Sequence, residues 1–174
     1  MPAPKVKLNL YQRGLMKIKI NVILLIAAIS VTLVSCGGYD PTNDKSPETS
    51  DITAAIITNG DFEELTDIQS DRLGWFYNIS ESLLESYSVM VCLSGGSADE
   101  VVVMKAASAD NAELIKTAVS ERKAERMHAF YEYRPEEYKK LTDSVVKSIG
   151  PYVLFVVSGD TDSAVRIFNG FFEK

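Results

Sequence analysis

The sequence contains few of the residues from which catalytic and metal sites are usually built. Its 174 residues include one histidine, His128, two cysteines and one tryptophan. A lone histidine cannot supply the paired imidazoles of a typical zinc site, and Cys92 lies in an apolar segment typical of an inert buried thiol. No P-loop, dinucleotide-binding fingerprint or Gly-x-Ser-x-Gly elbow occurs. The sequence therefore predicts no metal site, no cofactor and no catalytic residue.

Basic residues are scarce after the first 19 positions. Five of the 18 Lys and Arg residues lie between Lys5 and Lys19, and none of the 24 Asp and Glu residues precedes Cys36. The chain from Cys36 onward therefore has 13 basic and 24 acidic residues, a net charge of −11. A surface of this charge argues against nucleic acid as a partner and against electrostatic adhesion to anionic lipid.

No apolar run is long enough for a typical transmembrane helix. The longest, Val22–Val34, has 13 residues, whereas a span needs about 20. Basic residues precede this run and a small residue follows it, an order typical of a secretory signal peptide. We therefore interpret residues 1–35 as a signal segment, whether translation starts at Met1 or at Met16.

The residues Leu33-Val34-Ser35-Cys36 place a cysteine directly after a small residue at the end of this segment. The pattern resembles the signal of bacterial lipoproteins. The resemblance implies cleavage between Ser35 and Cys36, attachment of a diacylglycerol to the Cys36 thiol, and a location on the extracytoplasmic face of the cell membrane. Residues 36–50 are polar and contain two prolines, so we expect a flexible tether of about 20 Å. The membrane, reached through this lipid, is the first expected partner.

Hydrophobic periodicity divides residues 51–174 into the helices and strands of one domain. The segments expected to be helical are 51–59, 71–77, 110–133, 135–147 and 161–172. The segments expected to be strands are 87–93, 101–105 and 152–158, the first two forming a hairpin. The last strand is apolar on both faces, as a central strand would be. We therefore predict an α+β fold, in which a small, mainly antiparallel three-stranded sheet is covered on one face by helices and preceded by two short helices.

Four motifs of this domain carry a family resemblance. They are Ala98–Lys105 (ADEVVVMK), the long helix with Arg122, the break Tyr133–Glu136 (YRPE) and the turn Gly150–Val153 (GPYV). Together with the signal segment, the set resembles the DUF4358 family of bacterial lipoproteins over about residues 51–172. The resemblance implies the same location and fold. It implies no mechanism, because no activity is established for the family.

Arg122 and Arg126 lie one turn apart on the apolar stripe of the long predicted helix, where guanidinium groups must find partners or extend to solvent. Two interpretations stay open. In one, the arginines pair with acidic residues of the same domain, namely Asp99, Glu100 or Glu137. In the other, they contact an anion or an acidic partner, which would make them a binding site.

The leading hypothesis is that the protein is a lipid-anchored binding or accessory module of the cell envelope, which contacts an unidentified envelope protein or ligand. The alternative is an envelope hydrolase that uses carboxylates such as Asp99 and Glu100. Adjacent residues of a strand point to opposite faces, so these two cannot form a catalytic pair together. We therefore favour a non-enzymatic role, which includes an accessory lipoprotein whose domain folds without a ligand.

Overall fold

The computed structural model describes residues 46–173, all within the unit formed by Gly37–Lys174. Cys36, the signal segment 1–35 and most of the expected tether lie outside the described residues. The cleavage and lipid attachment expected there therefore stay predictions. No helix in the described part of the chain is long and apolar enough to cross a membrane.

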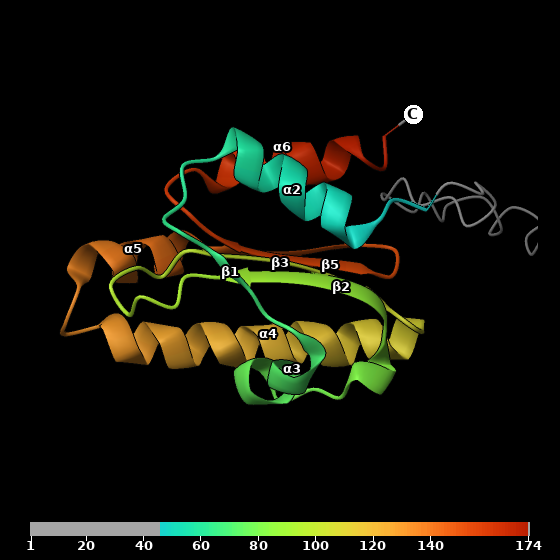
Figure 1. Cartoon of the computed structure of the whole chain (residues 1–174), viewed down its shortest axis with the longest axis horizontal. Coiled ribbons are helices and arrows are strands. Elements are labelled where there is room, and N and C mark those ends of the chain that lie inside the picture. The colour runs from blue at the N-terminus through green and yellow to red at the C-terminus, as the bar shows by residue number, and fades with distance from the viewer. Residues whose placement is uncertain (1–45, 174) are drawn as a thin grey trace, which may run out of the picture. The chain divides into compact units, whose positions relative to one another are not determined.

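A five-stranded antiparallel sheet forms the centre of the domain (Figure 1). Its strands are β1 (Thr66–Asp67), β2 (Leu84–Val91), β3 (Glu100–Ala106), β4 (Val145–Ile149) and β5 (Tyr152–Val157), in the order β1-β2-β3-β5-β4. The three predicted strands correspond to β2, β3 and β5, and β2 and β3 form the expected hairpin. The α+β class and the antiparallel pairing are confirmed, whereas the prediction of three strands is wrong.

Helices cover both faces of the sheet, not one face as predicted (Figure 1). On one face lie α2 (Thr49–Asn59) and α6 (Thr161–Gly170), and on the other lie α3 (Ser70–Tyr77) and α4 (Ala109–Phe130). A short 3-10 helix, Glu81–Leu83, precedes β2, and α5 (Pro135–Asp143) lies beside the C-terminal end of α4. Both predicted N-terminal helices are therefore present, and they cover opposite faces.

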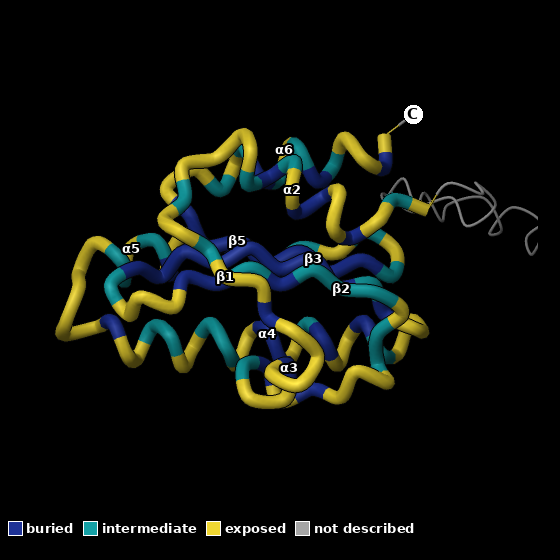
Figure 2. Tube along the Cα trace, viewed as in Figure 1, coloured by how far each residue is buried: buried dark blue, intermediate teal, exposed yellow. Residues whose placement is uncertain are grey.

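The central strands explain why two helical layers form, because β3 and β5 are apolar on both faces. Alternate residues of β3 enter different cores. Val101 and Val103 pack with Ile52, Ile56 and Phe168, while Val102 and Met104 pack with Ile115 and Val119. All six residues of β5 are buried, and Figure 2 shows these strands as the least exposed part of the domain.

The long helix α4 begins after Ser108, whose Oγ accepts a hydrogen bond from the backbone N–H of Asn111 at 3.1 Å. The helix ends at Phe130, one residue before Tyr131, which forms its C-terminal cap. The predicted helix over 110–133 is thus confirmed, with both ends shifted by one to three residues.

The predicted helix over 135–147 is wrong in its C-terminal part. The helix α5 ends at Asp143, and β4 follows as an edge strand paired with β5. A two-residue loop, Gly150-Pro151, joins the strands, and Gly150 has a positive φ of 53° that suits a tight hairpin. The apolar residues of β4 continue the helical spacing of α5. The local sequence pattern therefore predicts a helix where the strand forms. Pairing with the free edge of β5 decides the conformation.

The described chain begins at the end of the sheet opposite α5 (Figure 1). The Ser46 Oγ lies 2.6 Å from the Tyr152 hydroxyl, which donates a hydrogen bond to the Pro47 carbonyl at 2.9 Å. Tyr152 is paired with Lys105 at the C-terminal end of β3. The N-terminal end of β3 lies next to α5, so the two ends of this strand mark the two ends of the domain.

Candidate functional site

The two acidic residues at the start of β3 are buried. Asp99 and Glu100 have 1% and 0% of their surface exposed. Glu100 alternates in step with Val102 and faces α4, whereas Asp99 points to the other side and reaches Lys140 of α5. The two carboxylates therefore have separate partners.

Glu100 forms a closed cluster with Tyr77 and Arg122. The Tyr77 hydroxyl donates to Glu100 Oε1, and Arg122 donates from Nε to Oε1 at 3.4 Å and from Nη2 to Oε2 at 3.3 Å. The Arg122 guanidinium also lies 4.9 Å from the centre of the Phe76 ring. Burial, followed by the charge of Glu100, raises the pKa of Tyr77 well above its usual value. We call Tyr77, Glu100 and Arg122 the Glu100 cluster.

Asp99 links α5 to the sheet through hydrogen bonds. Its carboxylate accepts hydrogen bonds from Lys140 Nζ at 2.9 Å and from the Glu63 backbone N–H at 3.0 Å. Glu137 accepts the Ala98 backbone N–H at 2.7 Å and lies 3.2 Å from the same Lys140 Nζ. Burial alone would lower the pKa of Lys140, but the hydrogen bonds and charges of Asp99 and Glu137 outweigh it and raise that pKa. These contacts hold the N-terminal end of β3 against α5.

The two arginines singled out from the sequence have different surroundings. Arg122 is paired with Glu100, one of the three acids expected for it, while Arg126 donates from Nη2 to the Ser97 carbonyl at 3.0 Å and lies 4.7 Å from the Phe130 ring. Burial lowers the pKa of Arg126, and the charge of Glu100 opposes that change. The Arg126 Nε is buried without a partner in the described part of the chain. Contact with an anion or an acidic partner stays a prediction for both residues.

The remaining chemically active side chains are isolated. Within residues 46–173, no group of three His, Cys, Asp or Glu residues lies close enough to hold a metal ion. Cys92 is buried with its Sγ 3.2 Å from the Ser94 Oγ, and His128 is exposed on α4. The carboxylates of Asp99 and Glu100 are already bonded within the domain, so neither is available to a substrate.

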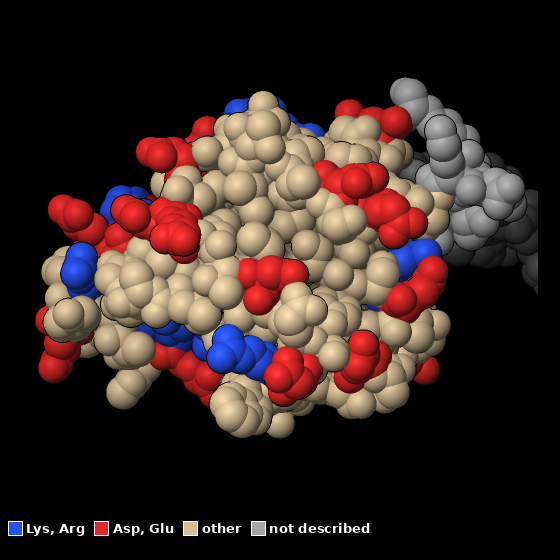
Figure 3. Space-filling view, in the orientation of Figure 1, with Lys and Arg blue, Asp and Glu red and all other residues tan. Residues whose placement is uncertain are grey.

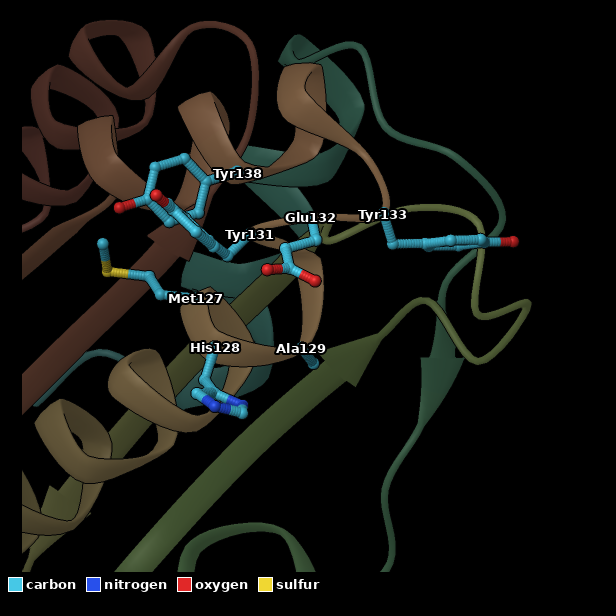
Figure 4. A pocket seen from close by; sticks show the side chains of 7 residues that line it. All are labelled: Met127, His128, Ala129, Tyr131, Glu132, Tyr133 and Tyr138. Carbon is cyan, nitrogen blue, oxygen red and sulfur yellow. The ribbon is translucent and has the colours of Figure 1, made fainter.

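A groove with a volume of about 620 Å³ lies where α4 ends and α5 begins. We call it the tyrosine groove, and it is lined by Met127, His128, Ala129, Tyr131, Glu132, Tyr133 and Tyr138 (Figure 4). The break between the helices creates it, because Tyr131 caps α4 and Arg134-Pro135 starts α5 in a new direction. The elements that form it, the C-terminal end of α4 and the start of α5, lie at the end of the sheet opposite the start of the described chain (Figure 1).

The rings of Tyr131 and Tyr138 meet edge to face, with centroids 5.3 Å apart and an interplanar angle of 74°. Figure 4 shows Met127 extending toward the same side, Glu132 beside Tyr131, and Tyr133 turned away from the other rings. Tyr131 and Tyr133 are 62% and 69% exposed. Sequence reasoning missed this groove. Its signal was the presence of three tyrosines within eight residues around Pro135.

The chain matches the model of one protein family. The model of a family described as Domain of unknown function (DUF4358) matches residues 58–158, more than half of the chain. The chain belongs to the DUF4358 family. The resemblance drawn from the sequence motifs is thereby confirmed for the domain. No curated protein and no solved structure matches the chain.

The DUF4358 match covers every residue of the Glu100 cluster, the Asp99 contacts and the tyrosine groove. It also covers all five strands, but α6 lies outside it and α2 overlaps it by only two residues. The part of this DUF4358 protein that defines the family is therefore the sheet with its α3, α4 and α5 side. Both candidate sites lie on that side.

Proposed function

We propose that this DUF4358 protein is a lipid-anchored binding module of the cell envelope, which is attached through Cys36 and binds its ligand in the tyrosine groove. The observation that carries the proposal is the groove itself. It is lined by the rings of Tyr131 and Tyr138, the Met127 thioether and the Glu132 carboxylate, which has no ion pair within residues 46–173. Small-molecule sites are usually concave, mostly apolar and equipped with a few polar groups.

The position of the groove supports the same role. The described chain begins at Ser46, which is fixed to Tyr152 at one end of the sheet, and the groove lies at the opposite end (Figure 1). A lipid at Cys36 would hold the first end near the membrane. The flexible tether expected for residues 36–50 would then leave the groove, at the other end, accessible to an envelope ligand.

A binding role fits the buried carboxylates better than hydrolysis does. General acid–base catalysis needs a group that can reach the substrate and exchange a proton with it. Asp99 and Glu100 are buried and satisfied by Lys140, Arg122 and Tyr77. Their contacts support a structural role.

The anchor is tested by fractionation of cells that express the full chain. We expect the protein in the membrane fraction, and we expect the Cys36→Ala variant to leave that fraction. An unchanged distribution of the variant, or an intact segment 1–35 by mass spectrometry, would disprove the anchoring part of the proposal.

The groove is tested by a photo-crosslinking amino acid at Ala129 in intact cells. Ala124 is the matched control, because it is an exposed alanine of the same helix outside the groove. We expect an adduct from position 129 that is absent from position 124 and is lost when Tyr131→Ala is added. No adduct, or equal adducts from both positions, would exclude the groove as the binding site.

A further inference from the structure

We propose that the tyrosine groove takes a small ligand that carries a methylated, quaternary ammonium group. The inference rests on the proposed function, because it names the chemistry of the ligand for the same groove. Four features of the groove lead to it: its charge, its ring faces, its number of acceptors and its size.

The groove has negative charge and no positive charge of its own. Glu132 is the only acidic residue among the lining residues, and no Lys or Arg lines the groove. Glu132 has no ion pair or side-chain hydrogen bond within residues 46–173. The lysines of α5 have acidic partners, since Lys139 pairs with Asp143 and Lys140 with Asp99. Within the described residues, the Glu132 carboxylate therefore has no cationic partner and can attract a cationic ligand.

The aromatic faces point to the same conclusion. Arginine guanidinium groups already lie over two neighbouring rings, Phe130 and Tyr133, at 4.7 and 5.6 Å from the ring centres. No Lys or Arg of the described chain lies over Tyr131 or Tyr138. A cation over the face of a tyrosine is attracted by the quadrupole of the ring, whose face is negative, and a nearby carboxylate adds its own Coulomb attraction.

The field of the whole domain adds to the local charge. The chain after Ser35 has a net charge of −11, and Figure 3 shows Asp and Glu side chains spread over the visible face with fewer Lys and Arg. Such a field raises the local concentration of cations and lowers that of anions. An anionic ligand is therefore disfavoured at Glu132.

The number of acceptors separates a quaternary ammonium from a primary one. A primary ammonium has three N–H donors, and each donor that loses water without gaining an acceptor costs free energy. The lining offers one charged acceptor, the Glu132 carboxylate. Its other side-chain acceptors are the tyrosine hydroxyls and the His128 ring, which have no formal negative charge. A methylated ammonium has no N–H to satisfy and keeps its charge, so it suits rings and a thioether better. The volume of about 620 Å³ is in the range of small-molecule sites.

The test uses the methionine methyl groups as reporters. The full-length protein, extracted from membranes in a nonionic detergent, is labelled with 13C-methyl methionine and titrated with choline. We expect the Met127 signal to shift in a saturable way. Met104 is buried in the core and Met90 packs against the other face of the sheet, so their signals should not move.

Two matched probes define the chemistry. The uncharged analogue of choline, 3,3-dimethylbutan-1-ol, has the same shape, and ethanolamine has the same alcohol with a primary ammonium. We expect both to bind the groove about tenfold more weakly than choline. The uncharged alcohol loses the attraction of a cation to the rings and to Glu132, whereas ethanolamine keeps its charge but loses hydrogen bonds from its N–H groups to water. Glu132→Gln should weaken choline binding several-fold, whereas Glu136→Gln, an exposed change outside the groove, should not.

The outcomes separate this inference from the proposed function. If the uncharged alcohol or ethanolamine binds as tightly as choline, the groove binds ligands but the ammonium inference is wrong. If none of the three probes moves the Met127 signal, the ammonium inference is also wrong, and crosslinking from Ala129 then decides independently whether the groove binds anything.

Discussion

Two groups of aromatic and charged residues lie along α4, and they differ in how fully their polar atoms are satisfied. In the Glu100 cluster, the carboxylate accepts from Tyr77 and Arg122 and has no exposed surface. In the tyrosine groove, Glu132 has no such partner in the part of the chain that the structure describes, and its neighbour Tyr131 is 62% exposed. The same residue types are therefore buried and paired around Arg122 in the middle part of α4, and exposed at its C-terminal end.

The comparison predicts that changes in the Glu100 cluster reduce stability, whereas changes in the groove reduce binding. The largest effect should follow Arg122→Met, which leaves the buried Glu100 carboxylate without its cation. Breaking a buried ion pair by removing one partner costs about 3–5 kcal/mol. Urea unfolding followed by circular dichroism should show a loss of this size.

The double variant Glu100→Met/Arg122→Met serves as the control. Replacing both partners by apolar residues removes the unpaired charge, so we expect most of the lost stability to return. A loss below about 1 kcal/mol for Arg122→Met alone would show that Arg122 does not have the structural role assigned to it.

Arg126→Met should cost less than Arg122→Met. Arg126 makes one hydrogen bond, to the Ser97 carbonyl, and its Nε is unpartnered in the described chain. We expect a loss of about 1 kcal/mol, the net contribution of one such bond. Adduct formation from Ala129 should be unchanged. A lost adduct at nearly unchanged stability would instead support the predicted role of Arg126 as a partner contact.

The raised pKa of Tyr77 predicts a pH dependence. Below the usual pKa of 10.0, the hydroxyl is protonated in the folded and in the unfolded chain, and its contribution to stability is fully present. Above that pH, the unfolded chain releases the proton while the folded chain keeps it, so the free energy of unfolding falls as pH rises, by up to about 1.4 kcal/mol per pH unit.

Tyr77→Phe has no hydroxyl to ionise and should lack this part of the decline. Unfolding curves of both proteins between pH 8 and 11 measure the difference. Parallel curves above pH 10 would mean that Tyr77 ionises as readily in the folded protein as in the unfolded chain, in conflict with its burial.

The smallest effect on stability should follow Tyr131→Ala, because exposed side chains contribute little to folding. We expect a change within about 0.5 kcal/mol, combined with loss of the adduct from Ala129. Trp75→Ala is the matched control, since Trp75 is also an exposed aromatic side chain and is not among the residues that line the groove. Equal losses of the adduct in both variants would remove Tyr131 as the ring that contacts the ligand.

Most elements of the fold were predictable because their patterns are local. Alternation in β2, the double-sided apolar run of β5 and the helical stripe of α4 each follow from residues within one segment. The edge strand β4 was not predictable, because its valines continue the helical spacing of α5. Only pairing with β5 decides between a helix and a strand there. The second helical layer was also missed, since nothing in α2 or α3 specifies which face of the sheet each one covers.

The candidate site was predictable only in part. The sequence pointed to Arg122 and offered Glu100 as one of three partners, because a charge on an apolar stripe needs an opposite charge nearby. It could not indicate that the two arginines would have unlike surroundings. The tyrosine groove depends on the angle between α4 and α5, which residue spacing does not encode.

The Tyr152 hydroxyl determines how long the segment between Cys36 and the folded domain is. Because this hydroxyl holds Ser46 and Pro47 against the sheet, only residues 37–45 separate Cys36 from a fixed point on the domain. Nine residues reach at most about 30 Å when fully extended, and the 22 residues of α4 add about 33 Å before the groove is reached. If Cys36 is acylated as we propose, the groove would lie within roughly 60 Å of the bilayer, and the proposed ligand would have to be close to the membrane surface.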